Sequence, residues 1–272
     1  MPARDDYLEA NRALWDEWTA IHEGSEFYDL ESFRKGGLRL YGFELEEVGD
    51  VRGKDLLHLQ CHFGMDTLSW ARLGARVTGV DFSGAAVELA RRLAEELELE
   101  ARFLQANVLD LPSLLRGKFD VVYTSRGVLG WLPDVPRWAG VVSHFLRPGG
   151  LFYIHEIHPF AYVFDVEEDA TVPRVKYPYF VPSEPLSFES SDYAVPDAEV
   201  KQPVAYDWSH SMGEIINALV DNGLRIDFLH EWPFLNWELP FLEKRDDGLW
   251  WYPGPGELPL SFSLRATKEP AS

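Results

Sequence analysis

Short apolar runs alternate with helical stripes of apolar residues between positions 54 and 157. Runs of this length are typical of strands buried on both faces of a parallel sheet. They predict strands at residues 55–60, 75–80, 101–106, 119–124 and 151–156. Helices are predicted between them, at residues 66–73, from the capping residue Ser83, and from Asp134 to the turn Pro148-Gly149-Gly150. The alternation therefore predicts an α/β fold with helices on both faces of a parallel sheet.

The pattern changes after residue 157. Residues 158–208 are rich in Pro, Tyr, Phe, Glu and Asp and show no helical stripe, which predicts a lid or a small β appendage. A capping box of Ser211 and Glu214 then predicts a helix that ends at Gly223. A sixth strand is predicted from Leu224 to Phe228, and residues 260–267 alternate as a last strand. Because no helix separates these two strands, the last one is predicted to pair antiparallel.

Composition narrows the partners that this chain can have. The formal net charge is −20, and no Lys/Arg cluster offsets it, so nucleic acid and anionic membrane surfaces are unfavourable partners. No apolar stretch is long enough for a membrane span, and the first residues show no signal-peptide pattern. The single cysteine, Cys61, fits a reducing compartment. We therefore expect a cytoplasmic globular protein, monomeric or homodimeric, that acts on a small molecule.

The residue that ends the second predicted strand is the strongest candidate ligand-binding residue. In open α/β sheets, ligands bind at the carboxyl ends of the strands near the point where strand order reverses. Asp81 lies at such an end, where its carboxylate could accept hydrogen bonds from both hydroxyls of a ribose. The alternative is a solvated turn aspartate that caps the next helix.

Four motifs together resemble the class I S-adenosylmethionine-dependent methyltransferases, over about residues 54–156. They are Val80-Asp81-Phe82-Ser83, Gln105-Ala106-Asn107-Val108, Phe119-Asp120-Val121-Val122 and Leu146-Arg147-Pro148-Gly149-Gly150. The resemblance implies a Rossmann-like, mostly parallel seven-stranded sheet with an antiparallel last strand. It also implies one domain, with an N-terminal helical cap (1–50), a cofactor-binding core (51–157), a substrate or lid insertion (158–208) and the C-terminal part of the sheet (209–272).

The same resemblance implies S-adenosylmethionine as cofactor and assigns its binding residues. Asp81 would bind the ribose, with Phe82 packed on the adenine and Asn107 and Val108 beside it. Thr124 and Ser125 would lie near the methionine portion. The first loop would contribute Gln60, Cys61, His62 and Gly64.

That first loop departs from the family pattern. His58, Gln60 and His62 stand where an acidic residue and two glycines are expected, and of the expected glycines only Gly64 is present. Side chains at these positions narrow the space next to the backbone. Either the loop takes a different path, with Gln60 bonding the amino acid portion of the cofactor, or the cofactor site is degraded. The other motifs favour the first account.

Candidate acid–base residues are expected beyond the fourth and fifth strands. They are Glu156, His158 and His210, any of which could take a proton from the acceptor, or could instead bond a loop or the lid. Their spacing does not match a metal site, so none is expected. His58 is interpreted as a core histidine, and Cys61 as a small packing residue.

Three functions remain open from the sequence. The first is O- or N-methylation of a small molecule. The second is a protein of the same fold that has lost catalysis or cofactor binding. The third, an NAD-dependent oxidoreductase, would need a Gly-x-Gly-x-x-Gly turn that this chain lacks.

Overall fold

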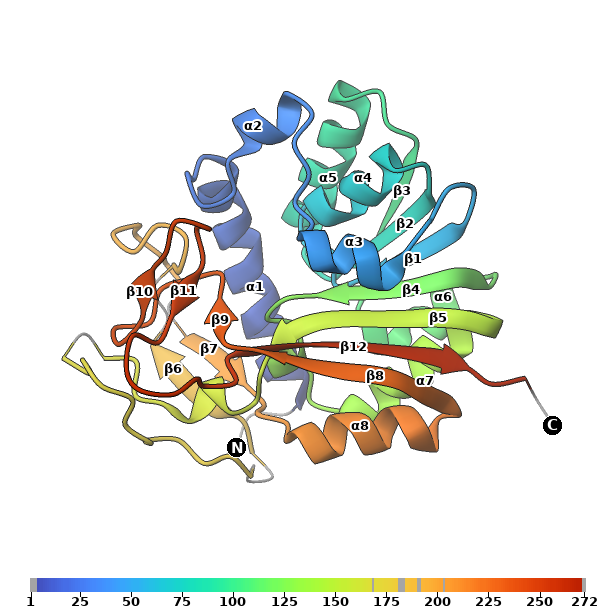
Figure 1. Cartoon of the computed structure of the whole chain (residues 1–272). Coiled ribbons are helices and arrows are strands. Elements are labelled where there is room, and N and C mark those ends of the chain that lie inside the picture. The colour runs from blue at the N-terminus through green and yellow to red at the C-terminus, as the bar shows by residue number, and fades with distance from the viewer. Residues whose placement is uncertain (1–3, 168, 181–183, 190–191, 203, 271–272) are drawn as a thin grey trace.

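A computed structural model describes residues 4–167, 169–180, 184–189, 192–202 and 204–270. Its centre is a seven-stranded sheet in the order β3-β2-β1-β4-β5-β12-β8 (Figure 1). The strands are β1 (Asp55–Leu59), β2 (Arg76–Asp81), β3 (Ala101–Gln105), β4 (Phe119–Ser125), β5 (Leu146–Ile157), β8 (Leu224–Trp232) and β12 (Ser261–Lys268). β12 pairs antiparallel with both β5 and β8, while β1 to β5 run parallel. The predicted mostly parallel sheet with an antiparallel last strand is confirmed.

Helices cover both faces of this sheet because residues that alternate along each strand are apolar on both sides. One face packs Leu57, Val122 and Ile154 against α6 (Leu111–Leu114), α7 (Val135–Phe145) and α8 (Met212–Asp221). The other packs Leu56 and Val121 against α3 (Gly42–Val48) and α4 (Met65–Arg72), and α5 (Gly84–Glu96) packs beside α4. None of the described helices is both long enough and apolar enough to cross a membrane.

Three predicted helix starts have the expected caps. The hydroxyl of Ser83 accepts the amide N–H of Ala86 at the start of α5, and Ser211 does the same for Glu214 at the start of α8. Asp134 caps α7 through the N–H of Arg137. These local bonds explain why the sequence located the helices well.

The remaining elements gather beyond the carboxyl ends of the parallel strands (Figure 1). They include the cap helix α1 (Arg4–Glu23) and the short α2 (Leu30–Arg34). The insertion contributes an antiparallel pair, β6 (Leu186–Glu189) and β7 (Val204–Asp207). A small sheet of β10 (Glu243–Lys244), β11 (Trp250–Trp251) and β9 (Phe234–Leu235) lies nearby. Short 3-10 turns are η1 (Val108–Asp110), η2 (Leu129–Trp131) and η3 (Ala161–Val163).

Two predicted boundaries were wrong. β5 begins at Leu146 and not at Leu151, because Leu146 pairs with Phe119 ahead of a register shift; α7 ends at Phe145, before the proline–glycine turn. The segment between the sixth and last strands, expected to be an aromatic loop, forms the small sheet of β9, β10 and β11. Its strands are two residues long, too short to give a periodic pattern.

Candidate cofactor and acceptor site

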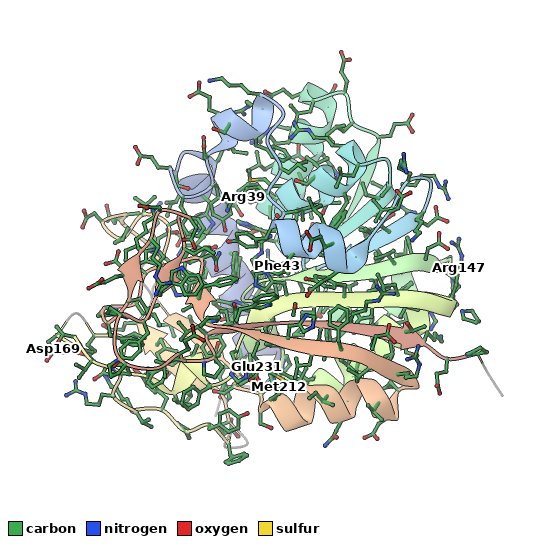
Figure 2. All side chains as sticks on the ribbon, viewed as in Figure 1. Arg39, Phe43, Arg147, Asp169, Met212 and Glu231 are labelled. Atoms are coloured by element: carbon green, nitrogen blue, oxygen red, sulfur yellow. The ribbon has the colours of Figure 1, made fainter. Side chains whose placement is uncertain are left out.

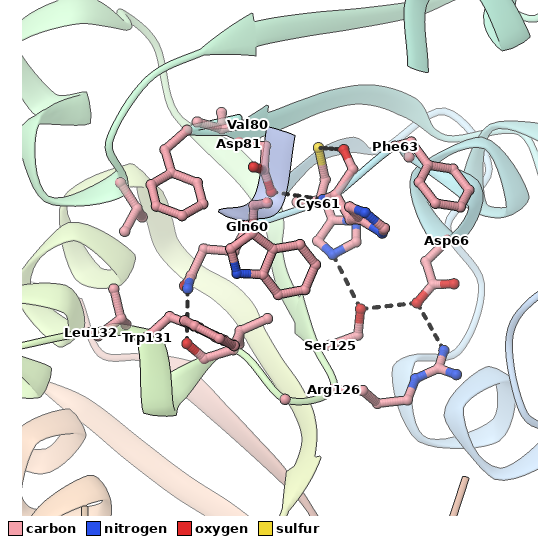
Figure 3. Close-up of a pocket in the computed structure, with 18 of the residues that line it drawn as sticks. Gln60, Cys61, Phe63, Asp66, Val80, Asp81, Ser125, Arg126, Trp131 and Leu132 are labelled. Carbon is pink, nitrogen blue, oxygen red and sulfur yellow. Dashed lines mark hydrogen bonds and ion pairs between the residues drawn. The ribbon is translucent and has the colours of Figure 1, made fainter. Parts of the chain in front are cut away.

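A cavity of about 360 Å³ lies at the carboxyl edge of the sheet, a size suited to a small ligand. Residues at the ends of β1, β2 and β4 line it (Figure 3). The cap and the insertion complete the wall. From the core it takes Gln60, Cys61, His62, Gly64, Asp81, Phe82, Asn107, Val108 and Ser125. The cavity therefore brings together nine of the ten residues expected to bind a cofactor. Thr124 is fully buried but does not line the wall, and its hydroxyl has no partner among the described residues.

Asp81 is buried at the end of β2 with both carboxylate oxygens facing backbone donors. One oxygen accepts the N–H of His62 at 2.8 Å and the other accepts the N–H of Ser83 at 2.9 Å. Burial raises the pKa of this carboxyl to about 6 in spite of these bonds. Each oxygen keeps a lone pair for a further donor, so the carboxylate can accept two neighbouring hydroxyls from the cavity.

Two non-glycine residues of the first loop, Gln60 and His62, have positive φ angles. The φ angles are 57° at Gln60, 51° at His62 and 79° at Gly64, all in the left-handed region. Such angles cost a non-glycine residue on the order of 1–2 kcal/mol. The amide of Gln60 donates to the carbonyl of Val128 at 3.0 Å, while its side-chain oxygen is buried without a partner in the described part of the chain. The loop therefore holds left-handed angles that glycine adopts most readily, and the side-chain oxygen of Gln60 remains a free acceptor in the described part of the chain.

A chain of buried polar groups forms one side of the cavity below this loop. His58 contacts the hydroxyls of Thr67 at 2.8 Å and Ser125 at 3.2 Å, as expected for a satisfied core histidine. Burial, with the positive charge of Arg126, lowers its pKa to about 3, which keeps the ring neutral. Ser125 and Arg126 both donate to Asp66, at 2.9 and 2.8 Å (Figure 3).

Arg126 also forms an ion pair with the buried carboxylate of Glu44 at 3.4 Å. Burial alone would raise the pKa of Glu44, but Arg126 and hydrogen bonds from His155 and Tyr41 outweigh it and lower that pKa to about 2. The phenol of Tyr123 donates to the same carboxylate at 2.8 Å. A fixed ionic network thus supports the cavity at the end of β4.

The cap helix α1 covers the cavity and is fixed to both the core and the insertion. Trp15 packs edge-on against His62 and Trp131, with ring centroids 5.0 and 5.3 Å apart. Asp16 accepts the hydroxyl of Ser83 at 2.6 Å and the N–H of Ala85 at 3.1 Å, at the start of α5. On the next turns of α1, His22 pairs with Asp192 of the insertion at 2.9 Å, with both side chains fully buried.

The three residues expected to act as acid or base do not line this cavity. The carboxylate of Glu156 accepts the backbone N–H groups of residues 127, 128 and 129, which holds the loop after β4 in place. His158 pairs with Glu231 at 3.0 Å and accepts the N–H of Phe160. His210 contacts Glu214 and the carbonyl of Leu132. Each position has a structural role in the described chain.

Sequence reasoning missed several polar residues of the cavity wall, of which Arg39, Asp66, Arg126 and Asp207 matter most. Arg126 directly follows β4, so its place at a strand end was a usable signal. Arg39 lies between α2 and α3 (Figure 2), with its guanidinium over the ring of Tyr28 at 5.7 Å. Its backbone bonds Ser69 and Arg126, but no described residue forms an ion pair or a hydrogen bond with the guanidinium. Arg39 and Asp207 lie in segments whose apolar residues show no periodicity, so no sequence pattern indicated that they reach the cavity.

Comparisons with known proteins agree with this geometry. Residues 57–152 match the family model of a methyltransferase domain. The chain is 32% identical over 161 residues to a ubiquinone biosynthesis O-methyltransferase of Alkalilimnicola ehrlichii, covering 58% of this chain and 62% of that relative. It is 37% identical over 154 residues to the protein of the same name from Nitrosococcus oceani, covering 55% and 61%. The chain thus spans under two thirds of the length of these curated relatives.

A solved structure supports the fold over a longer span. A putative S-adenosylmethionine-dependent methyltransferase from Listeria monocytogenes superposes with a TM-score of 0.57, over 84% of this chain and 97% of that one, at 17% identity. The strand order and the matched domain agree with the motifs found in the sequence. Residues 57–152 therefore match a methyltransferase domain, and the fold of the chain is that of the S-adenosylmethionine-dependent methyltransferases.

Proposed function

We propose that this protein binds S-adenosylmethionine in the cavity and transfers its methyl group to an oxygen atom of a small molecule. The observation that carries the proposal is the buried carboxylate of Asp81, which faces the cavity at the end of β2 with an acceptor site left on each oxygen. S-adenosylmethionine would supply an electrophilic methyl group on its sulfonium sulfur.

The residues around Asp81 suit an adenosine. The side-chain oxygen of Asn107 accepts the N–H of Leu109 at 3.0 Å, which leaves the side-chain N–H groups of Asn107 available to a ring nitrogen. Phe82 and Val108 contribute apolar side chains to the same cavity wall. We therefore assign the adenosine half of the cofactor to this part of the cavity.

The methionine half would lie along the first loop and the end of β4. The unpartnered side-chain oxygen of Gln60 and the carboxylate of Asp66 suit an ammonium group, and the guanidinium of Arg39 suits a carboxylate. The left-handed backbone at Gln60 and His62 supports a working loop over a degraded one, since strain of this kind persists where function requires the shape.

Transfer to oxygen is favoured over nitrogen by the curated relatives, which are named O-methyltransferases. NAD-dependent chemistry lacks its glycine motif here. The cavity wall also includes aromatic side chains, among them Trp15, Tyr28 and Trp131, which suit an apolar acceptor.

Calorimetric titration with S-adenosylmethionine, S-adenosylhomocysteine and NAD, run in parallel, tests the cofactor. We expect micromolar binding of the first two and none of NAD. If none of the three binds, the protein is a non-catalytic member of its fold; if NAD alone binds, the proposed reaction is wrong.

A further inference from the structure

Asp207 lies in the cavity wall at the end of β7, in a segment far from the cofactor motifs. The next residue, Trp208, donates its N–H to the carbonyl of Gly130 at 2.8 Å. That contact sets Asp207 beside the loop after β4, where Val128 also accepts the amide of Gln60. The carboxylate is therefore next to the part of the first loop that we assign to the methionine half, on the side of the insertion.

The chain makes room for this carboxylate and gives it no partner. A Cβ atom at Gly130 would collide with the carboxylate of Asp207, so glycine at that position permits the close approach. No described residue donates a hydrogen bond to the carboxylate or forms an ion pair with it. An acceptor left open toward a cavity is suited to a donor that arrives with a ligand.

The charge environment keeps Asp207 ready to exchange a proton. Burial and the negative charge of Glu156 raise its pKa to about 7, close to the optimum for a general base at neutral pH. The buried phenol of Tyr162 also interacts electrostatically with Asp207. Burial, with the charges of Glu156 and Asp207, raises the pKa of Tyr162 well above its usual range. Tyr162 therefore stays protonated while Asp207 titrates.

We propose that Asp207 is the general base of the reaction and that the acceptor is a phenol, held by the aromatic part of the cavity wall. That part consists of Trp15, Tyr28, Trp131, Tyr162, Tyr193 and Trp237. Flat aromatic side chains favour a planar acceptor ring through stacked or edge-on contacts. This inference rests on the proposed methyl transfer to oxygen and names its acceptor class and its base.

A hydroxyl suits this carboxylate better than an amine does. A nearby anion raises the pKa of an ammonium group and would hold an amine in its protonated, non-nucleophilic form. A phenol can instead pass its proton to Asp207 as its oxygen bonds to the methyl carbon and the sulfur–methyl bond breaks. The sulfonium becomes a neutral thioether, the phenol becomes a methyl ether, and Asp207 later releases the proton to water, so atoms and charge balance.

Two substitutions of Asp207 separate binding from proton transfer. The probes are para-cresol and catechol as acceptors, and 4-methylanisole as the matched ether. Asp207→Asn keeps an oxygen that can accept the hydroxyl but cannot take its proton. We expect it to bind para-cresol nearly as well as wild type, with kcat lower by about 100-fold or more. Asp207→Ala should lose both turnover and the preference for para-cresol over 4-methylanisole.

The pH profile and a matched control complete the test. Wild-type kcat/KM should fall below about pH 7, where Asp207 is protonated, and Asp207→Asn should lack this acid limb. Glu189→Gln removes an exposed carboxylate from β6, the strand paired with β7, and should behave as wild type. Unchanged affinity for S-adenosylhomocysteine in both Asp207 variants would show that the cofactor site is intact.

Three results would overturn the inference: full activity of Asp207→Asn, no preference of wild type for para-cresol over its ether, or no methyl transfer to either phenol. Failure of the cofactor to bind would instead overturn the proposed function, and calorimetry without an acceptor detects that separately.

Discussion

Single residues in the first loop keep a backbone shape that usually requires glycine. Gln60 has a φ angle of 57°, a conformation that a side chain disfavours. We expect Gln60→Gly to be more stable than Gln60→Ala by about 1 kcal/mol, because both lose the amide but only glycine relieves the backbone. Urea unfolding of the two variants measures this difference. Equal stabilities would mean that the loop relaxes to another path once the amide is removed.

Asp81 offers a second prediction at this scale. Asp81→Asn should weaken binding of S-adenosylmethionine by about 1–3 kcal/mol, because one ribose hydroxyl would lose its acceptor. Wild-type affinity should also fall as pH drops through about 6, where the carboxyl becomes protonated, and the variant should lack this fall. Calorimetry between pH 5 and 8 measures both effects, with the exposed Asp221→Asn as control. Wild-type affinity in Asp81→Asn would remove Asp81 from the ribose site.

The sequence located the cofactor-loop candidates in the cavity wall but misplaced the candidate acid–base residues, for a physical reason. Asp81 and Gln60 follow buried strands, so the sheet alone fixes where they meet. Glu156 also ends a strand, but its side chain turns to three backbone N–H groups of a neighbouring loop, a contact that no sequence period encodes. Asp207 reaches the cavity only through the fold of the insertion.

At the scale of elements, α1 contributes Leu8 and Trp15 to the cavity wall. Asp16 holds α1 against the start of α5 through Ser83 and Ala85. Asp16→Ala should therefore speed the release of S-adenosylhomocysteine by about 10- to 100-fold, because hydrogen bonds to a charged group contribute about 1.5–3 kcal/mol. It should also raise hydrogen exchange along α1. Stopped-flow release and exchange mass spectrometry measure these effects.

A surface substitution on the same helix controls for general loss of helix stability. Glu9 is exposed and pairs with Arg12 one turn away. Glu9→Ala should leave both the release rate and exchange near the cavity unchanged. Similar acceleration in the two variants would show that α1 opens through its own unfolding and not through the contact with α5.

Elements of the core were predicted closely, while those at the rim were not. Strands and helices of the sheet have full apolar patterns and side-chain caps, so their positions follow from local sequence. The pair β6–β7 and the three strands of the small sheet are only two to four residues long. Contacts made across the molecule fix these short strands, and such contacts leave no periodicity.

At the scale of the whole molecule, buried acids set how stability depends on pH. Burial raises the pKa values of Asp81 and Asp207 from 3.8 to about 6 and about 7. Because the folded state holds these protons more tightly, their contribution to stability is complete below about pH 4 and is lost as pH rises through 7. Glu44 acts oppositely: its contribution is present above about pH 4.5 and is lost toward pH 2.

We therefore expect the melting temperature to be highest near about pH 5 and to fall toward pH 8. The double variant Asp81→Asn, Asp207→Asn should show a flatter profile over this range. Salt separates this effect from general repulsion by the net charge of −20. High ionic strength screens repulsion between exposed charges but has little effect on buried carboxyls. Sodium chloride should raise the melting temperature at pH 8 in both proteins. The pH profile of the double variant should remain flatter than that of wild type. A profile that stays parallel to wild type would contradict the role of the two carboxyls.

The left-handed loop of Gln60 and His62 bears on how relatives of this chain are found. A search for glycines at fixed spacing passes over such a loop, although Gln60 and His62 hold angles that glycine adopts most readily. Left-handed torsion angles can be held by residues other than glycine as long as neighbouring contacts support them, as the bond from Gln60 to Val128 does here. Families defined by a glycine signature should then include members that only their dihedral angles reveal, and some catalogued as inactive for lack of glycine could be working enzymes.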